Sequence, residues 1–187
     1  MKNSCFLFFI FFLFGSCQRN DIETLNGPFF SYLNRNGVSI DTVAKAAKFW
    51  EYGFQFKSLK LQTMNGVGIK VPAIGIFKVK LYDLVLGKLL LDTVVNSFIT
   101  NQETYININE IKLVENGVFG IAIVADVFFK VKNVNNAPHD FPHTSGNLEI
   151  ISFNEDTCGI NGCSIFPVTI NKQIIAPSVN IQLINTD

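Results

Sequence analysis

Two histidines and an aspartate lie close together in the sequence Pro138-His139-Asp140-Phe141-Pro142-His143. Imidazole nitrogens and carboxylates bind transition metals, so His139, Asp140 and His143 form a candidate metal site, which makes a metal-dependent hydrolase one hypothesis. The spacing fits the second ligand pair of a zinc finger, but the matching cysteine pair is missing. Pro142 also argues against the helix that carries a His-Glu-X-X-His motif. The alternative interpretation is a proline-stiffened surface loop with polar side chains.

Other residue patterns that are typical of catalysis are absent from the sequence. It contains no Gly-X-Ser-X-Gly motif, and Gly66-Val67-Gly68 is only a fragment of a phosphate-binding loop. The sequence therefore predicts no cofactor and favours a protein that is not an enzyme. It does not indicate which carboxylates converge, so a glycosidase-like pair stays open.

Cys158 and Cys163 are separated by the four residues Gly159-Ile160-Asn161-Gly162. A zinc site would need two further ligands that the neighbouring residues do not supply, and redox-active pairs usually have two intervening residues. Glycine gives the backbone the freedom that a small ring needs. We therefore expect a structural disulfide, formed in an oxidising compartment.

The N-terminus begins with the basic residue Lys2, followed by the apolar run Cys5–Phe14. As a helix, this run would extend about 15 Å, roughly half of a bilayer core, which is too short to span it. A short apolar run between a basic start and small residues is typical of a secretory signal peptide.

The residues Leu13-Phe14-Gly15-Ser16-Cys17 resemble the lipobox of bacterial lipoproteins. The resemblance implies that the signal is cleaved before Cys17, that the thiol of Cys17 carries a diacylglyceryl group, and that its new amine is acylated. Phe14 departs from the leucine that the family prefers, and Gly15 is less usual than alanine or serine. The alternative is an ordinary signal cleaved near Ser16 or Cys17, which leaves a secreted protein.

The resemblance also implies a place in the bacterial cell envelope. No aspartate follows Cys17 directly, where it would retain a lipoprotein in the inner membrane, so we expect an outer-membrane lipid anchor. Arg19, Asp21 and Glu23 resemble the charged signal of surface-exposed lipoproteins in Bacteroidetes, and an ordinary solvated linker is the alternative. The leaflet stays open. We expect residues 1–16 to be the signal peptide, 17–27 the lipidated cysteine and its tether, and 28–187 one β-rich domain.

The full chain has 15 basic and 15 acidic side chains, and both signs are scattered along it. A nucleic-acid-binding surface needs a basic excess, so nucleic acid is not an expected partner. For the same reason, membrane attachment would come from the lipid and not from a basic patch. A protein or glycan partner is the remaining expectation.

After the tether, apolar residues with helical spacing predict one amphipathic helix near the N-terminus, from Ser39 to Trp50. The rest of the chain shows period-2 alternation. Phe77, Val79 and Leu81 are predicted to face a core and Lys78, Lys80 and Tyr82 to face solvent. The other predicted strands include 105–109, 118–132, 148–153, 165–170, 173–175 and 179–184. We expect a turn at Met64-Asn65-Gly66, a hairpin turn at Glu115-Asn116-Gly117 between residues 111–114 and Val118, and either a hairpin or a short helix within 84–95.

About nine short strands without regular helices between them predict an antiparallel β-sandwich or barrel-like domain. The preferred functional hypothesis is a lipid-anchored envelope protein whose β-domain binds a partner or ligand without catalysis. A periplasmic inhibitor or immunity lipoprotein is the second hypothesis, and the metal-dependent hydrolase is the third.

Overall fold

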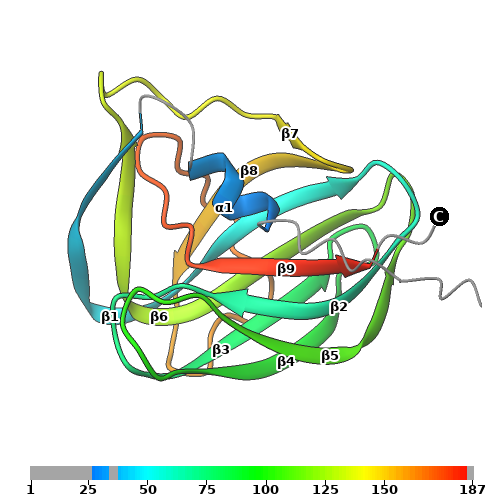
Figure 1. Ribbon diagram of the computed structural model, residues 1–187, viewed down its shortest axis with the longest axis horizontal. Coiled ribbons are helices and arrows are strands. Elements are labelled where there is room, and N and C mark those ends of the chain that lie inside the picture. The colour runs from blue at the N-terminus through cyan, green and yellow to red at the C-terminus, as the bar shows by residue number, and fades with distance from the viewer. Residues whose placement is uncertain (1–26, 34–37, 185–187) are drawn as a thin grey trace, which may run out of the picture.

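The computed structural model of the protein describes residues 27–33 and 38–184 (Figure 1). The predicted signal peptide, Cys17 and the predicted tether up to residue 26 lie outside the described residues. The described part begins with a short helix, α1 (Pro28–Leu33). The strands that follow are β1 (Val38–Ser58), β2 (Gln62–Ile69), β3 (Gly75–Asp83), β4 (Lys88–Ser97), β5 (Thr104–Leu113), β6 (Val118–Asn133), β7 (His143–Ser145), β8 (Leu148–Thr157) and β9 (Val179–Ile184). No helix of this part is long and apolar enough to cross a membrane.

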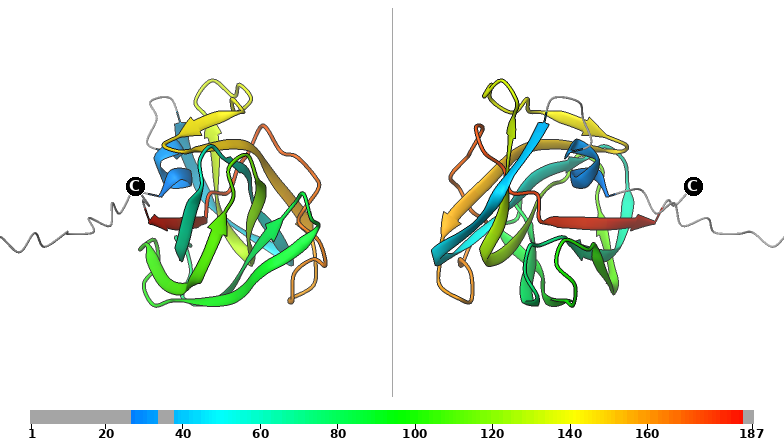
Figure 2. Two further views of the ribbon diagram at one scale, coloured as in Figure 1. Left: turned by 90° about the vertical axis from the view of Figure 1, so that its right-hand side faces the viewer. Right: turned by 60° about the vertical axis from the view of Figure 1, so that its left-hand side comes forward.

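The strands form two antiparallel sheets. The large sheet has six strands in the order β4-β3-β6-β1-β8-β7, and the small sheet has three in the order β5-β2-β9. The small sheet lies against one face of the large sheet (Figures 1 and 2). The prediction of a mainly β domain with antiparallel strands is confirmed. Val118–Asn133 is a central strand, because β6 pairs with both β1 and β3. Its long apolar run is typical of a strand that is covered on both faces.

The hydrophobic core lies between the two sheets and takes residues from both. The large sheet contributes Tyr52, Phe54, Phe56, Phe77, Val79, Leu81, Ile121 and Ile123, and the small sheet contributes Met64, Val67, Ile69, Ile181 and Leu183. The phenyl ring of Phe29 in α1 stacks on Phe54 with 4.6 Å between ring centroids, so α1 packs onto this core. Phe77, Val79 and Leu81 face the core as predicted.

The amphipathic helix predicted from Ser39 to Trp50 is wrong, because these residues belong to the long strand β1. β1 pairs with β6 along its length, and its ladder is interrupted between Asp41 and Val43 and between Lys45 and Trp50. Such irregularities insert residues that shift the inside-outside alternation. The apolar spacing therefore imitates a helical period, while the long-range pairing with β6 determines the structure.

Three further expectations need correction. Met64-Asn65-Gly66 is not a turn but an irregularity within β2, where the pairing register shifts. Residues 165–170 and 173–175 form no strands and make only isolated bridges, Asn154–Ile170 and Val131–Ile175. Both belong to the connection between β8 and β9, in which 165–170 lies on the face of the large sheet opposite the core and Ile175 packs into the core.

Two predicted turns are present. The hairpin alternative within 84–95 is confirmed, because β3 and β4 pair across a turn with Gly87 at a φ of 62°. At Glu115-Asn116-Gly117 the chain also turns, with Asn116 at a φ of 60°. This turn joins β5 of the small sheet to β6 of the large sheet, so the hairpin predicted here is wrong and the turn links the two layers instead.

Candidate functional site

Residues 158–178, between β8 and β9, form a connection that we call the crossing segment. Its first part, residues 158–170, covers the face of the large sheet that points away from the small sheet, and Figure 2 shows this part on the side of the molecule opposite β9. Ile175 and Ala176, near its end, instead belong to the core between the sheets. Side chains alternate between the faces of a strand, so Lys80 and Tyr82 point away from the core that Val79 and Leu81 enter. This outer face, under the crossing segment, holds the polar clusters described below.

The crossing segment begins with the predicted disulfide between Cys158 and Cys163, whose Cα atoms are 5.2 Å apart. The disulfide closes a ring that contains Gly159 and Gly162, and the amide of Gly162 donates a hydrogen bond to the carbonyl of Gly159. The prediction of an intramolecular disulfide is confirmed. The ring fixes the start of the crossing segment on the outer face of β1 and β3.

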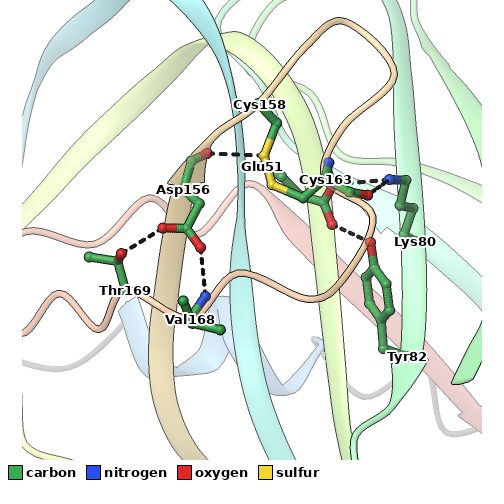
Figure 3. Close-up of a disulfide and its surroundings, with 8 residues drawn as sticks. All are labelled: Glu51, Lys80, Tyr82, Asp156, Cys158, Cys163, Val168 and Thr169. Carbon is green, nitrogen blue, oxygen red and sulfur yellow. Dashed lines mark hydrogen bonds and ion pairs between the residues drawn. A yellow bond between two sulfur atoms is a disulfide. The ribbon is translucent and has the colours of Figure 1, made fainter. Parts of the chain in front are cut away.

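A buried ion pair lies directly beneath this ring (Figure 3). Glu51 of β1 is 0% exposed and Lys80 of β3 is 4% exposed, and their Oε2 and Nζ atoms are 3.0 Å apart. The hydroxyl of Tyr82 donates to Oε1 of Glu51 at 2.5 Å. Buried charges are stable only when they are paired and hydrogen-bonded, and this carboxylate has partners on both oxygens.

The ion pair holds the backbone of the disulfide ring. The amide of Cys163 donates to Oε2 of Glu51 at 2.7 Å, and the ammonium of Lys80 donates to the carbonyl of Cys163 at 2.7 Å. Gly162 has a φ of 80°, and a Cβ atom there would be 2.6 Å from the Lys80 ammonium and still closer to the Glu51 carboxylate. Glycine at position 162 therefore allows the ring to lie flat against the ion pair.

Tyr82 connects this cluster to the middle of the crossing segment. Burial raises the pKa of the Tyr82 hydroxyl well above its ordinary value, and the hydrogen bond to Glu51 and its negative charge raise the pKa further. The rings of Tyr82 and Phe166 meet edge to face with 5.7 Å between centroids. Phe166 also lies over Gly120 of β6, where a Cβ atom would be 2.5 Å from the phenyl ring.

Asp156, near the end of β8, holds the next part of the crossing segment (Figure 3). Its carboxylate accepts hydrogen bonds from the amide of Val168 at 2.7 Å and from the hydroxyl of Thr169 at 2.5 Å. The amide of Glu155 donates to the carbonyl of Thr169 at 2.9 Å. The crossing segment is thus fixed at both ends of its central stretch, residues 164–170.

A half-open cleft of about 380 Å³ lies between this stretch and the turn that joins β3 to β4. Its walls are mainly apolar and consist of Leu84, Leu89, Ile165, Phe166, Val168 and Ile170. Three of these side chains, Ile165, Val168 and Ile170, are more than half exposed. Concave sites with apolar walls and a few polar groups are typical of ligand-binding sites.

Two side-chain amides also line the cleft, from the adjacent strands β1 and β8. Gln55 and Asn154 lie on the outer face, where Gln55 pairs with Ser152 and Gly53 pairs with Asn154. The hydroxyl of Ser152 donates to Oδ1 of Asn154 at 2.6 Å and lies 3.4 Å from Oε1 of Gln55. Neither amide nitrogen donates to another side chain or to the backbone in the described part of the chain. Each amide therefore offers hydrogen-bond donors to the cleft.

The residues of the predicted metal site lie elsewhere, in the connection between β6 and β8. His139 is 2% exposed, with Nδ1 3.1 Å from the hydroxyl of Tyr32 and Nε2 3.1 Å from the carbonyl of Val131. Because both ring nitrogens lie within hydrogen-bond distance of protein groups, His139 would have to give up a contact to bind a metal. Asp140 is exposed, and the ring of His143 meets that of Tyr32 edge to face.

The arrangement thus places His139 and His143 around α1 and not around a shared ligand position. Within residues 27–33 and 38–184, Glu51, Cys158 and Cys163 are the one group of three potential metal ligands whose ligand atoms converge. The two sulfur atoms of that group form the disulfide, and both Glu51 oxygens accept hydrogen bonds. This group therefore acts as a structural cluster.

Sequence reasoning missed the groups that build the cleft. Alternation predicts Lys80 and Tyr82 on a solvent-facing side, but the crossing segment covers that side and buries both. Gln55 and Asn154 carry no motif at all. One signal was available in the sequence: Glu51 lies between the large aromatic residues Trp50 and Tyr52, a setting in which a carboxylate needs a partner if it is buried.

Comparison of the chain with models of known protein families and with curated protein sequences finds no match.

Proposed function

We propose that the protein is a lipid-anchored bacterial envelope protein whose β-domain binds a ligand without catalysis. The anchor rests on the resemblance of Leu13–Cys17 to a lipobox, with Cys17 as the acylated residue in the outer membrane. Several acyl chains on one residue hold a protein firmly at a membrane, whereas one chain alone gives only marginal binding. The two sheets around one core support a β-sandwich as the fold of the domain.

The cleft between residues 164–170 and the β3–β4 turn is the observation that carries the binding function. Ile165, Val168 and Ile170 on its walls stay exposed to solvent. The hydrophobic core of the domain lies on the other face of the large sheet. The hydrogen bonds that Val168 and Thr169 donate to Asp156, together with the disulfide ring, hold residues 164–170 in place before any ligand arrives. A preformed site binds more tightly than a flexible one because less conformational entropy is lost on binding.

The polar cluster supports a structural role over a catalytic one. Glu51, Lys80 and Tyr82 are almost fully buried beneath the disulfide ring, and each is bonded to another member of the cluster or to Cys163. A catalytic acid or base must come within hydrogen-bond distance of its substrate. These groups instead stabilise the segment that forms one wall of the cleft.

Binding in the cleft is testable with Nile red, a neutral dye that fluoresces in apolar surroundings. The protein for this test is the mature chain, residues 17–187, with Cys17→Ser. We expect saturable binding at one site and a loss of about tenfold in affinity for Ile165→Asp, because a carboxylate then replaces an apolar wall. The matched control is Ile99→Asp, since Ile99 is 58% exposed against 63% for Ile165 but does not line the cleft. Equal effects of the two variants, or no saturable binding, would contradict the proposal.

The anchor has a separate test in cells. We expect the wild-type chain to incorporate labelled palmitate and to fractionate with outer membranes, and Cys17→Ser to lose both properties. Retention of Cys17→Ser in the membrane fraction would show that another feature attaches the protein.

An inhibitor or immunity lipoprotein is a second candidate, favoured by a different surface. Ile74, Ile76, Phe98 and Ile99 are exposed near the paired residues Gly75 and Ser97, at one end of β3 and β4. Exposed apolar groups of this kind often mark protein–protein contacts. Affinity capture from envelope extract separates the candidates: one tightly bound enzyme that Phe98→Asp releases would favour the inhibitor, and no such enzyme would count against it.

A further inference from the structure

We propose that the cleft selects an uncharged ligand that combines an aliphatic chain with a hydrogen-bond-accepting oxygen, such as a medium-length acyl amide or ester. This inference rests on the proposed binding function and specifies its ligand class. It follows from the two amides at the cleft, the aliphatic walls and the charges of the lining residues.

The hydroxyl of Ser152 determines how the amide of Asn154 is oriented. Ser152 is 4% exposed, and its hydroxyl donates to the carbonyl oxygen of Asn154 at 2.6 Å and lies near that of Gln55. A hydroxyl that donates to an amide oxygen fixes which end of that amide turns toward it. Asn154, itself 4% exposed, thus turns its NH2 group away from Ser152, and it lines the cleft.

The side-chain NH2 groups of Gln55 and Asn154 have no protein acceptor within the described residues. Neither Gln55 nor Asn154 donates a hydrogen bond from its amide nitrogen within the described residues. A purely apolar ligand would cover these donors and leave them without a partner, which is costly, whereas a ligand oxygen placed there accepts a hydrogen bond. The cleft therefore favours a ligand that accepts hydrogen bonds at this position.

The charges of the residues that line the cleft favour a neutral ligand. The residues that line the cleft include no lysine or arginine, and their one carboxylate is that of Asp83. Oδ1 of Asp83 accepts hydrogen bonds from the amides of Val85 and Leu86, both at 2.9 Å. An anionic ligand would find no cation and would meet the charge of Asp83. An ammonium ligand would meet the NH2 donors of Gln55 and Asn154. A neutral carbonyl oxygen suits the site best.

The walls of the cleft favour an aliphatic chain as the apolar part of the ligand. Leu84, Leu89, Ile165 and Val168 offer aliphatic contacts, whereas Tyr82 and Phe166 are nearly buried and expose little ring surface for stacking. A sugar would need such a ring face or several more polar partners. An acyl chain needs only apolar contact, and each methylene that it buries should improve affinity about fourfold.

The test is displacement of Nile red from the mature chain by octanamide, octanoate, octylammonium and the shorter pentanamide. We expect octanamide to bind at least about tenfold more tightly than octanoate, which finds no cation in the cleft, and than octylammonium, whose head group faces the NH2 donors of Gln55 and Asn154. Pentanamide should bind at least about tenfold more weakly than octanamide, since it lacks three methylenes. Circular dichroism checks that each variant below is folded.

Two nearly isosteric variants remove the donors and leave the oxygens that face Ser152. Asn154→Asp and Gln55→Glu should each weaken octanamide binding about fivefold and improve the relative affinity of octylammonium. Asn96→Asp is the matched control, because Asn96 is an exposed residue of β4 that does not line the cleft. If Gln55→Glu does not fold, Gln55→Met removes the same donors without adding a charge.

The outcomes separate this inference from the proposed function. If Nile red binds in the cleft but the three octyl compounds differ by less than twofold, the ligand class is wrong and the binding function stands. The same holds if the variants keep the wild-type preference. If Ile165→Asp and Ile99→Asp bind the dye as the wild type does, both proposals fail.

Discussion

The carboxylate of Glu51 and the ammonium of Lys80 lie 3.0 Å apart beneath the backbone of Cys163, which hydrogen-bonds to both. This pair joins two strands of the large sheet, β1 and β3, to the segment that covers them. A charge pair buried in this way contributes little net stability over an apolar pair, but the loss of one member is costly. The wall of the cleft is therefore sensitive to the loss of either charge alone.

Lys80→Met should destabilise the protein by about 3 to 5 kcal/mol, because it leaves the Glu51 carboxylate buried without a cation. The double variant Glu51→Leu with Lys80→Met should recover much of this loss, since neither charge then remains. Urea denaturation of the two single variants and the double variant measures the coupling. Additive losses in this double-mutant cycle would mean that the two groups act independently.

Removal of the disulfide by Cys158→Ser with Cys163→Ser should lower the free energy of unfolding by about 2 kcal/mol, as expected for a short ring. Nile red affinity should fall as well, because residues 164–170 lose one of their fixed ends. Mass spectrometry of the non-reduced protein checks that Cys158 and Cys163 form a disulfide. Free thiols at both positions would contradict it.

Gly162→Ala should destabilise the protein more than Gly146→Ala does. Both glycines have left-handed backbones, with φ of 80° and 59°, so both variants acquire similar backbone strain of about 1 kcal/mol or more. A Cβ at position 146 meets nothing within 4 Å, whereas a Cβ at 162 meets the Glu51–Lys80 pair. The difference in melting temperature between the variants thus reports the contact with the ion pair. Equal melting temperatures would place the ring away from Glu51.

Alkaline pH should unfold the protein together with ionisation of its buried tyrosines. Burial raises the pKa of both Tyr52 and Tyr82 well above the ordinary value of about 10. The folded state then keeps phenol protons that the unfolded state releases. The stability that these groups contribute is complete below about pH 10 and falls as the pH rises above it, by up to about 1.4 kcal/mol per pH unit for each tyrosine.

Absorbance at 295 nm and far-ultraviolet circular dichroism, recorded from pH 9 to 13, check this prediction. Much of the tyrosinate signal should develop only as the sheet signal is lost. In Tyr82→Phe the free energy of unfolding should fall less steeply above about pH 10, because one ionising group is gone. Complete ionisation of all tyrosines in the folded protein near pH 10 would contradict the burial of Tyr52 and Tyr82.

Local sequence patterns predict the strands well where one face is buried and the other is solvated. Phe77, Val79 and Leu81 are examples, and 179–184 coincides with β9. The pattern fails at β1, where two irregularities in the pairing with β6 remove the period-2 signal that a strand otherwise shows. It also fails at 165–175, whose apolar residues line the cleft or, like Ile175, pack into the core without forming strands.

The candidate site is harder to predict because its parts are joined only by the fold. The disulfide is a local feature, and Cys158 and Cys163 are close enough in sequence for their pairing to be expected. Glu51 and Lys80 come from different strands, and nothing in the sequence indicates that they become neighbours. The NH2 donors of Gln55 and Asn154 form part of a ligand site only because of the fold. Ser152 orients the amide of Asn154, and the crossing segment forms a wall of the cleft that both residues line.

The most direct test of the cleft as a ligand site is a titration of the ¹⁵N-labelled mature chain with octanamide, followed by NMR. The largest chemical-shift changes are expected at the side-chain NH2 groups of Gln55 and Asn154 and at the backbone amides of residues 164–170. Residues such as Ile74 and Phe98, outside the cleft, should change little. Largest changes at Ile74 and Phe98, or no changes at millimolar ligand, would contradict the account.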